Sequence, residues 1–198
     1  MKMNPGIRNI GCFLLLIFLS AIVVSAQGRS KFVTVKGKNF IAPDGSVLRL
    51  KGINLGTWML PEGYMFEFKK ASSPEKIYLM MNELIGEAKA RAFWKEFRDH
   101  YITREDIRFL KTAGFNHVRI PFNFRHFVNR DDPSKLEGIG YELLARVVNW
   151  CKQEGLYVVF DMHAAPGGQT GDNIDDSMGY PYLFESEEDQ DLTVRIWA

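Results

Sequence analysis

The sequence predicts an α/β fold built around a parallel sheet. Stretches with strand-like and helix-like patterns alternate over residues 50–198, and this succession is typical of parallel strands joined by helices. The run Leu156–Phe160 is apolar at every position, as in a strand buried on both faces. It turns polar at Asp161 and His163 and continues into a loop rich in proline and glycine, which is the pattern of an active-site rim in an α/β barrel.

Two architectures fit this succession, an open doubly wound sheet and a closed (β/α)8 TIM barrel. No G-x-G-x-x-G motif follows the first strand, so the open dinucleotide-binding fold lacks its main signature. Long loops with polar and aromatic residues follow the strand ends, which favours the barrel. Only about three βα units are visible, whereas a complete barrel needs eight and about 250 residues. We therefore expect residues 27–198 to form the N-terminal part of a barrel domain, truncated before strand 4.

Turn and cap signals predict the individual elements. An N-terminal β-hairpin of two short strands is expected around the turn Pro43-Asp44-Gly45, capping one end of the barrel. The capping-box pair Thr103 and Asp106 begins one helix, and Gly114 ends it. The remaining predictions are a first core strand at Leu50–Leu55, helices beginning at Ser73-Pro74-Glu75 and spanning about Glu87 to His100, a strand at Phe115–Ile120 closed by Pro121, and helices at Tyr141–Glu154 and Ser186–Trp197.

The aromatic residues of the second helix, Phe93, Trp94, Phe97 and Tyr101, recur at helical spacing. We interpret them as packing residues rather than as a binding surface.

Residues 1–26 have the features of a signal peptide. Lys2 and Arg8 form a basic start, Ile10–Val24 is almost wholly apolar, and Val24-Ser25-Ala26 offers small residues for cleavage. A retained anchor is the alternative, but the run is short for a membrane span. We expect a secreted or periplasmic, cell-surface protein with no membrane association after cleavage.

The composition argues against a nucleic-acid partner and against stabilisation by disulfides. Cleavage would remove Lys2 and Arg8 and no acid, changing the 25 basic and 24 acidic residues to 23 and 24. This balance argues against a nucleic-acid partner, which calls for a basic face. Cys151 would be the one cysteine left, so stability has to come from an apolar core rather than from an intrachain disulfide.

Polar residues at the strand ends are the candidate site residues. Side chains alternate along a strand. Arg119 and His117 therefore share one face of their strand, and Asp161 and His163 share one face of the next strand. An inward Arg119 would be unfavourable without carboxylate partners, so we expect acids nearby. Asp161 is interpreted as a hydrogen-bonded strut. A metal site formed by Asp161, His163 and His117 is the alternative, but we expect no metal and no cofactor.

Three segments carry a resemblance to a known family. They are Gly52–Trp58 followed by Glu62 and Tyr64, then Gly114–Pro121, then Asp161–Gln169. In this order and spacing they resemble the opening motif and the second- and third-strand motifs of glycoside hydrolase family 5, particularly its exo-β-1,3-glucanase-like branch.

The resemblance implies a (β/α)8 barrel that hydrolyses β-glucosidic bonds in β-glucan or cellulose with retention, as a monomer without cofactor. Such chemistry uses two carboxyl groups about 5–5.5 Å apart. In the family both are glutamates, on strands 4 and 7, the former in an Asn-Glu-Pro motif. The one Asn-Glu here, Asn82-Glu83, is followed by Leu84. The resemblance thus implies that both glutamates lie beyond residue 198 and that this chain alone is inactive; the alternative is a non-catalytic carbohydrate-binding protein or truncated pseudo-enzyme.

The resemblance also implies roles for residues that are present. Arg119 would keep the nucleophile ionised, and His163 would donate to the sugar beside the scissile bond. Glu62 and Tyr64 would hold the sugar on the non-reducing side. The substrate-binding set is completed by Asn123, Gln169, Asp172 and Asn173. Loop departures, including Asn123-Phe124-Arg125-His126 after Pro121, leave the linkage specificity open.

Overall fold

The computed structural model describes residues 32–198 and divides the chain after Leu50 into two compact units. The predicted signal peptide at residues 1–26 lies outside the described residues. Within residues 32–198, no helix has the length and apolar character needed to cross a membrane.

The first unit contains three short antiparallel strands: β1 (Thr34–Lys36), β2 (Asn39–Ile41) and β3 (Val47–Leu48), in the order β1-β2-β3. The predicted turn at Pro43-Asp44-Gly45 connects β2 to β3, and Gly45 takes the positive φ that the turn needs. The prediction of two strands was wrong, because a second turn at Gly37, also with positive φ, separates β1 from β2. That this unit caps a barrel stays a prediction.

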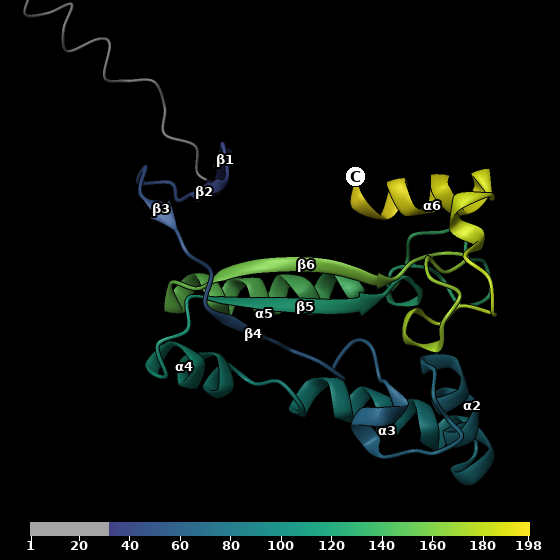
Figure 1. The fold of residues 1–198 in the computed structure, drawn as a ribbon. Helices are drawn as coiled ribbons and strands as arrows, with labels where there is room; N and C mark the ends of the chain where they lie inside the picture. Colours follow the sequence, from purple (N-terminus) through teal and green to yellow (C-terminus); the bar gives the residue numbers. More distant parts are fainter. Residues whose placement is uncertain (1–31) are drawn as a thin grey trace, which may run out of the picture. The chain divides into compact units, whose positions relative to one another are not determined.

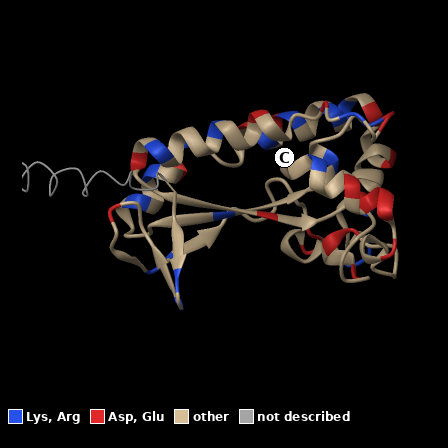
Figure 2. Cartoon of the chain, turned by 90° about the horizontal axis from the view of Figure 1, so that it is seen from above, with Lys and Arg blue, Asp and Glu red and all other residues tan. Residues whose placement is uncertain are grey.

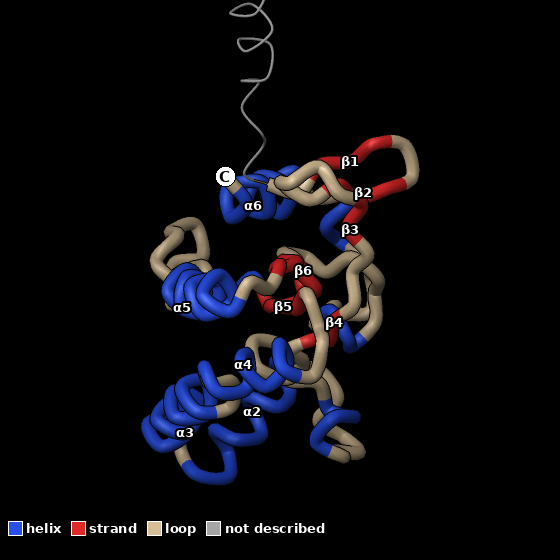
Figure 3. The backbone as a smooth tube through the Cα atoms, turned by 90° about the vertical axis from the view of Figure 1, so that its left-hand side faces the viewer, coloured by secondary structure: helices blue, strands red, loops and turns tan. Residues whose placement is uncertain are grey.

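The second unit is an α/β arrangement. Its sheet has three parallel strands in the order β4-β5-β6, namely β4 (Gly52–Asn54), β5 (His117–Asn123) and β6 (Tyr157–Ala164) (Figure 1). Helices α4 (Arg104–Thr112) and α5 (Gly140–Glu154) lie along one face of this sheet (Figure 3). The other long helices are α2 (Pro74–Ile85), α3 (Glu87–His100) and α6 (Glu187–Trp197), and short 3-10 turns occur at η2 (Gly63–Phe66), η3 (Phe124–His126), η4 (Asn173–Asp175) and η5 (Tyr182–Phe184).

The main core lies between the sheet and these helices. Val118, Ile120 and Phe122 are buried on the helix-facing side of β5. They pack in one cluster with Ile107 and Leu110 of α4 and with apolar residues of α5. Burying each such side chain contributes about 1.5–3 kcal/mol. The predicted alternation along this strand, with Val118 and Ile120 towards the helices, is confirmed.

Strand β5 does not end at Pro121 as predicted but continues to Asn123. In a strand, the N–H and C=O of alternate residues point to the same neighbour. The carbonyl of Arg119 accepts from Leu55 N, and Asn123 N donates to Met59 O, so the nitrogen of Pro121 faces the same side. Strand β4 ends at Asn54, before it reaches the position opposite Pro121. The missing N–H of the proline therefore costs no hydrogen bond between strands.

The predicted helix ends are confirmed. Thr103 Oγ1 accepts from Asp106 N and the Asp106 carboxylate accepts from Thr103 N, which completes the capping box of α4. Ser73 and Ser186 accept from Lys76 N and Asp189 N, respectively. Three acids occupy the first turn of α6, where the helix dipole favours them, and acidic residues gather there in Figure 2.

The aromatic residues of α3 pack as predicted. The Trp94 ring meets Tyr78 of α2 edge-on at 4.8 Å, and Phe97 stacks on Tyr101 at 4.5 Å. Burial raises the pKa of Tyr78 to about 12. Trp58 Nε1 donates to Arg98 O at 2.9 Å, which ties the segment after β4 to α3.

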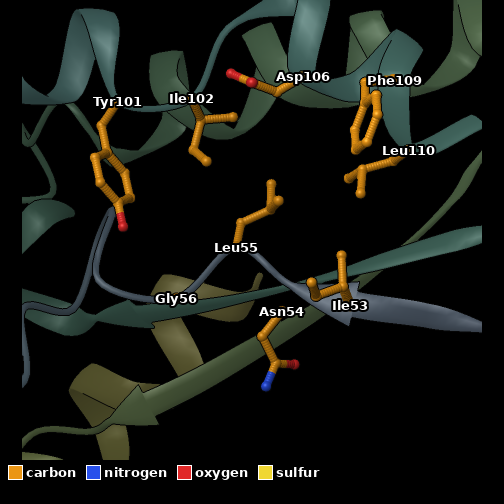
Figure 4. A pocket seen from close by; sticks show the side chains of 9 residues that line it. All are labelled: Ile53, Asn54, Leu55, Gly56, Tyr101, Ile102, Asp106, Phe109 and Leu110. Carbon is orange, nitrogen blue, oxygen red and sulfur yellow. The ribbon is translucent and has the colours of Figure 1, made fainter. Parts of the chain in front are cut away.

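A pocket of about 270 Å³ lies between β4 and α4 (Figure 4). Ile53 and Leu55 point towards Ile102 and Leu110, whereas Asn54 points away from them. The pocket is therefore an apolar packing gap on the helix side of the sheet, and Asn54 lies on the side of Arg119, its register partner.

His126 gives the fold a pH dependence. Its Nε2 lies 3.0 Å from Met59 O, and burial, together with the charge of Arg98, lowers the pKa of His126 to about 4. Since the unfolded chain binds this proton near the ordinary pKa of about 6.5, stability should fall as the pH drops from about 6.5 to 4.

We expect His126→Gln, which keeps a donor and does not titrate, to lose less stability than the wild type between pH 7.5 and 5. Urea unfolding of the complete protein at both pH values measures this. Equal losses in the two proteins would show that His126 does not carry the effect.

Candidate active site

Arg119, Asp161 and His163 meet at the carboxyl end of the parallel sheet. Arg119 pairs in register with Val159, so Asp161 and His163 follow on the same face of the neighbouring strand. Arg119 Nη2 donates to Asp161 Oδ2, His163 Nδ1 lies 2.9 Å from the same oxygen, and Arg119 Nη2 lies 3.2 Å from His163 Nδ1. The structure thus brings together the two residues predicted to support catalysis.

These contacts restrict the tautomer of His163. A guanidinium can only donate, so Nδ1 either accepts from Arg119 or donates to Asp161, but cannot do both with one proton. The contact with Asp161 is the shorter one, and the Asp161 oxygen already holds Arg119. We therefore assign the proton to Nδ1, which leaves Nε2 of neutral His163 free to accept a hydrogen bond.

Asp161 supplies a carboxylate partner that Arg119 was predicted to need. Its role as a strut agrees with its bond to Arg119 on the neighbouring strand and its contact with His163 on its own strand. The side chains of Arg119, Asp161 and His163 keep 32%, 25% and 28% exposure, respectively, so this face remains open to further groups.

Glu62 joins this cluster from the segment after β4. It is only 8% exposed, and burial raises the pKa of its carboxyl, although interactions with His163, Arg119 and the Tyr64 hydroxyl oppose the rise. Tyr64 itself is 68% exposed. A carboxyl group with a raised pKa beside an arginine and a histidine is a typical feature of functional sites.

Gln169 fixes the backbone behind His163. Its Oε1 accepts from Ala165 N at 2.9 Å, and its Nε2 donates to His163 O at 3.0 Å. The sequence predicted a contact with substrate, but both ends of this amide are bonded within the chain. We assign Gln169 a structural role, holding the turn that follows the strand.

Asn123 is likewise committed to the protein. It is buried, its Oδ1 accepts from Arg125 N, and its Nδ2 donates to Asp176 Oδ2, both at 3.0 Å. A substrate contact would require these bonds to break, so we assign this predicted binding residue a structural role as well.

Asp172 and Asn173 lie in the loop after β6. Asp172 is exposed and its carboxylate accepts from Asn173 N at 2.6 Å. Asn173 Nδ2 donates to Ser72 O at 3.1 Å, so its amide links the loop to the segment before α2. Asp172 thus keeps an accessible carboxylate, whereas the side chain of Asn173 is engaged.

Two neighbouring aspartates in this loop were not predicted as important. Asp175 is buried and accepts from Gln169 N at 2.8 Å and from Thr170 N at 2.6 Å. Burial raises the pKa of Asp175, but hydrogen bonds from Ser177, Gln169 and Thr170 outweigh it and leave the pKa lowered. Aspartates among glycines are a signal for such turns, and the sequence does offer it.

The described part of the chain contains no group of three histidine, cysteine, aspartate or glutamate side chains placed to hold a metal ion. His117 lies at the opposite end of β5 from Asn123, and its buried Nδ1 has no hydrogen-bond partner.

The bond between Arg119 and Asp161 should stabilise the fold measurably. In a double-mutant cycle with Arg119→Ala and Asp161→Ala, we expect a coupling of about 1–2 kcal/mol, since the pair is partly buried and charge-assisted. The exposed pair Arg91 and Glu87, one helical turn apart, is the matched control and should couple more weakly. Urea unfolding gives both values, and additivity of the two single changes at Arg119 and Asp161 would contradict the expectation.

Comparison with known proteins agrees with this geometry. The sequence model of the Cellulase family, glycosyl hydrolase family 5, matches residues 78–190. A "Beta-xylosidase" of Phanerodontia chrysosporium is 31% identical over 84% of this chain and 35% of its own length. A "Probable glucan 1,3-beta-glucosidase A" of Aspergillus clavatus is 28% identical over 79% of this chain and 37% of its own length. "Endoglucanase C" of Acetivibrio thermocellus is 36% identical over 54% of this chain and 30% of its own length.

The chain spans about a third of the length of these curated relatives. Among solved structures, a rutinosidase from Aspergillus niger superposes with a TM-score of 0.62 at 20% identity, covering 75% of this chain and 42% of that one. This likeness is one of fold and is consistent with part of an α/β barrel. The family match covers more than half of the chain and includes the strands that carry Arg119 and His163, and the chain therefore belongs to glycosyl hydrolase family 5.

Proposed function

We propose that the complete protein hydrolyses β-glucosidic bonds in a β-linked polysaccharide or oligosaccharide, with retention of configuration. The observation that carries this proposal is the cluster of Arg119, Asp161 and His163 at the strand ends of a family 5 chain. Residues 1–198 contain no Asn-Glu-Pro motif. The two catalytic glutamates of the proposed mechanism would come from chain beyond residue 198, so residues 1–198 alone would be inactive.

In this mechanism Arg119 supplies a fixed positive charge. Its guanidinium has five donors, of which the bond to Asp161 occupies one. The remaining donors can hold a carboxylate nucleophile and keep it ionised at neutral pH, because an adjacent cation lowers the pKa of an acid. With the proton on Nδ1, His163 Nε2 would accept from a sugar hydroxyl rather than donate to the sugar, as the family resemblance implied.

Glu62 and Tyr64 would bind the sugar on the non-reducing side. Glu62 lies close enough to Arg119 and His163 for both side chains to affect its pKa, and the ring of Tyr64 is exposed. Asp172 offers a further exposed carboxylate in the loop after β6. Carboxylates and an aromatic ring of this kind suit the hydroxyl groups and the apolar face of a sugar.

The location and the assembly state complete the proposal. Residues 1–26 would act as a signal peptide and send the protein to the cell exterior or periplasm, where the mature enzyme would work as a monomer.

Assays of the complete protein on laminarin, carboxymethyl-cellulose and mannan test the function, and an aryl β-xyloside is added because one relative is named a β-xylosidase. We expect hydrolysis of at least one glucan with a β-configured first product by NMR. Binding of these polymers without hydrolysis would favour the non-catalytic alternative. The absence of both binding and hydrolysis would refute the proposal.

Arg119→Ala should lower kcat by orders of magnitude, because the nucleophile would lose the cation that keeps it ionised. Circular dichroism should show a retained fold, and Arg91→Ala on the exposed face of α3 should leave kcat unchanged. Near-normal turnover of Arg119→Ala would remove Arg119 from the site.

A further inference from the structure

Asp176 joins three parts of the chain that are distant in sequence. Its side chain is 4% exposed, and its backbone has a φ of 62°, in the left-handed region that aspartate tolerates better than most non-glycine residues. Its carboxylate accepts from Glu75 N at 3.0 Å, from Asn123 Nδ2 at 3.0 Å and from Arg125 Nε at 3.4 Å. One buried carboxylate thus holds the start of α2 and the end of β5.

The contact with Glu75 fixes the beginning of α2. Glu75 is in the first turn of this helix, where backbone N–H groups lack partners within the helix. Ser73 accepts from Lys76 N, and Asp176 accepts from Glu75 N, so the second cap comes from a different part of the chain. A negative charge at this end of a helix is also favoured by the helix dipole.

The same loop reaches the segment that carries Glu62. Ser72 O accepts from Asn173 Nδ2 and from Gly63 N, each at 3.1 Å. Gly63 follows Glu62 directly, and a Cβ at this position would collide with the carbonyl of Ala71. Glu62 is therefore one residue from a backbone contact that the loop supports.

The other end of the loop is fixed to the strand of His163. Gln169 bonds to the backbone of Ala165 and His163, and Asp175 accepts from Gln169 N and Thr170 N. Hydrogen bonds thus connect the end of β6 to Asp175 through Gln169, and they connect Asn173 of the same loop to Ser72 O, the acceptor of Gly63 N. Asp176 adds its bond to Glu75 N, three residues after Ser72, and so holds the segment that carries this acceptor.

We propose that Asp176 is a positioning residue that holds Glu62 beside Arg119 and His163 for binding of the sugar. The claim deepens the proposed function and rests on it. Glu62 would contact the sugar equally in the ground state and the transition state, and loss of such uniform binding raises KM with little change in kcat. A purely structural tie would lower stability without changing KM.

The test is a double-mutant cycle on the complete protein with Asp176→Ala and Glu62→Gln. We expect Asp176→Ala to raise KM on the preferred glucan by about tenfold, with kcat within about twofold. In the Glu62→Gln background the same change should raise KM less than twofold further, because residues that act through one another are not additive.

Two further variants separate positioning from general stability. Asp106→Ala removes a comparable aspartate from the cap of α4 and should leave KM unchanged. The exchange variant Asp176→Asn/Asn123→Asp returns a hydrogen bond and a carboxylate to the same pair and should recover most of the wild-type KM. Failure of Asp176→Ala to raise KM, or an equal rise in the Glu62→Gln background, would overturn the proposal.

Hydrogen exchange gives a readout that does not depend on activity. In Asp176→Ala the amides of residues 62–72 should exchange at least about tenfold faster, since Ser72, whose carbonyl accepts from Gly63 N, would lose the support of the Asp176 bond to Glu75 N. The same segment should be unchanged in Asp106→Ala. If the wild type hydrolyses no substrate, the proposed function fails, and faster exchange would still support the positioning of this segment, whereas unchanged exchange would overturn it.

Discussion

The parallel register between β5 and β6 is the constraint on which the site depends. It sets Arg119 opposite Val159, so that the next two inward residues of β6, Asp161 and His163, lie within hydrogen-bond reach of the guanidinium. A shift of β6 by one residue would turn Asp161 and His163 towards the helices, away from Arg119. The register is held by the opposite face, where the apolar residues of β5 pack against α4 and α5. The core therefore fixes the chemistry through the alternation of the strands.

The sheet alone does not bring Glu62 to this place. Glu62 lies between β4 and α2, and its position depends on the loop after β6, with Asn173 on Ser72 and Asp176 on Glu75. Residues from three connections thus converge at one end of the sheet. This is the expected consequence of parallel strands, whose carboxyl ends all face the same way.

Much of the fold could be predicted because it depends on local signals. Caps such as Thr103 and Ser186, glycine at helix ends and apolar periodicity act over a few residues and are visible in the sequence. Alternation also predicted that Asp161 and His163 share a face of their strand, although their contact with Arg119 was not predicted. Pro121 was misread because proline ends a strand only where its missing N–H would have had a partner, and that depends on where β4 stops.

The loop after β6 was harder to predict, for a physical reason. Gln169 in this loop and Asn123 at the end of β5 have side chains that can bond to a sugar as well as to the protein itself. The sequence does not show which of these partners they meet. In the folded chain both amides form hydrogen bonds within the protein. A buried amide without a partner would lower the stability of the fold by about 1–3 kcal/mol. Asp176 was not singled out for the same reason, since its three partners come from residues 75, 123 and 125.

The charges of the site follow from the same arrangement. One fixed cation, Arg119, faces the ionised Asp161 and lies near Glu62, and the proposed nucleophile would add a further carboxylate. Like charges at short range raise one another's pKa, so a single guanidinium cannot keep every acid ionised. Burial raises the pKa of the Glu62 carboxyl and Arg119 opposes that rise, so Glu62 is one of the acids that share this single cation.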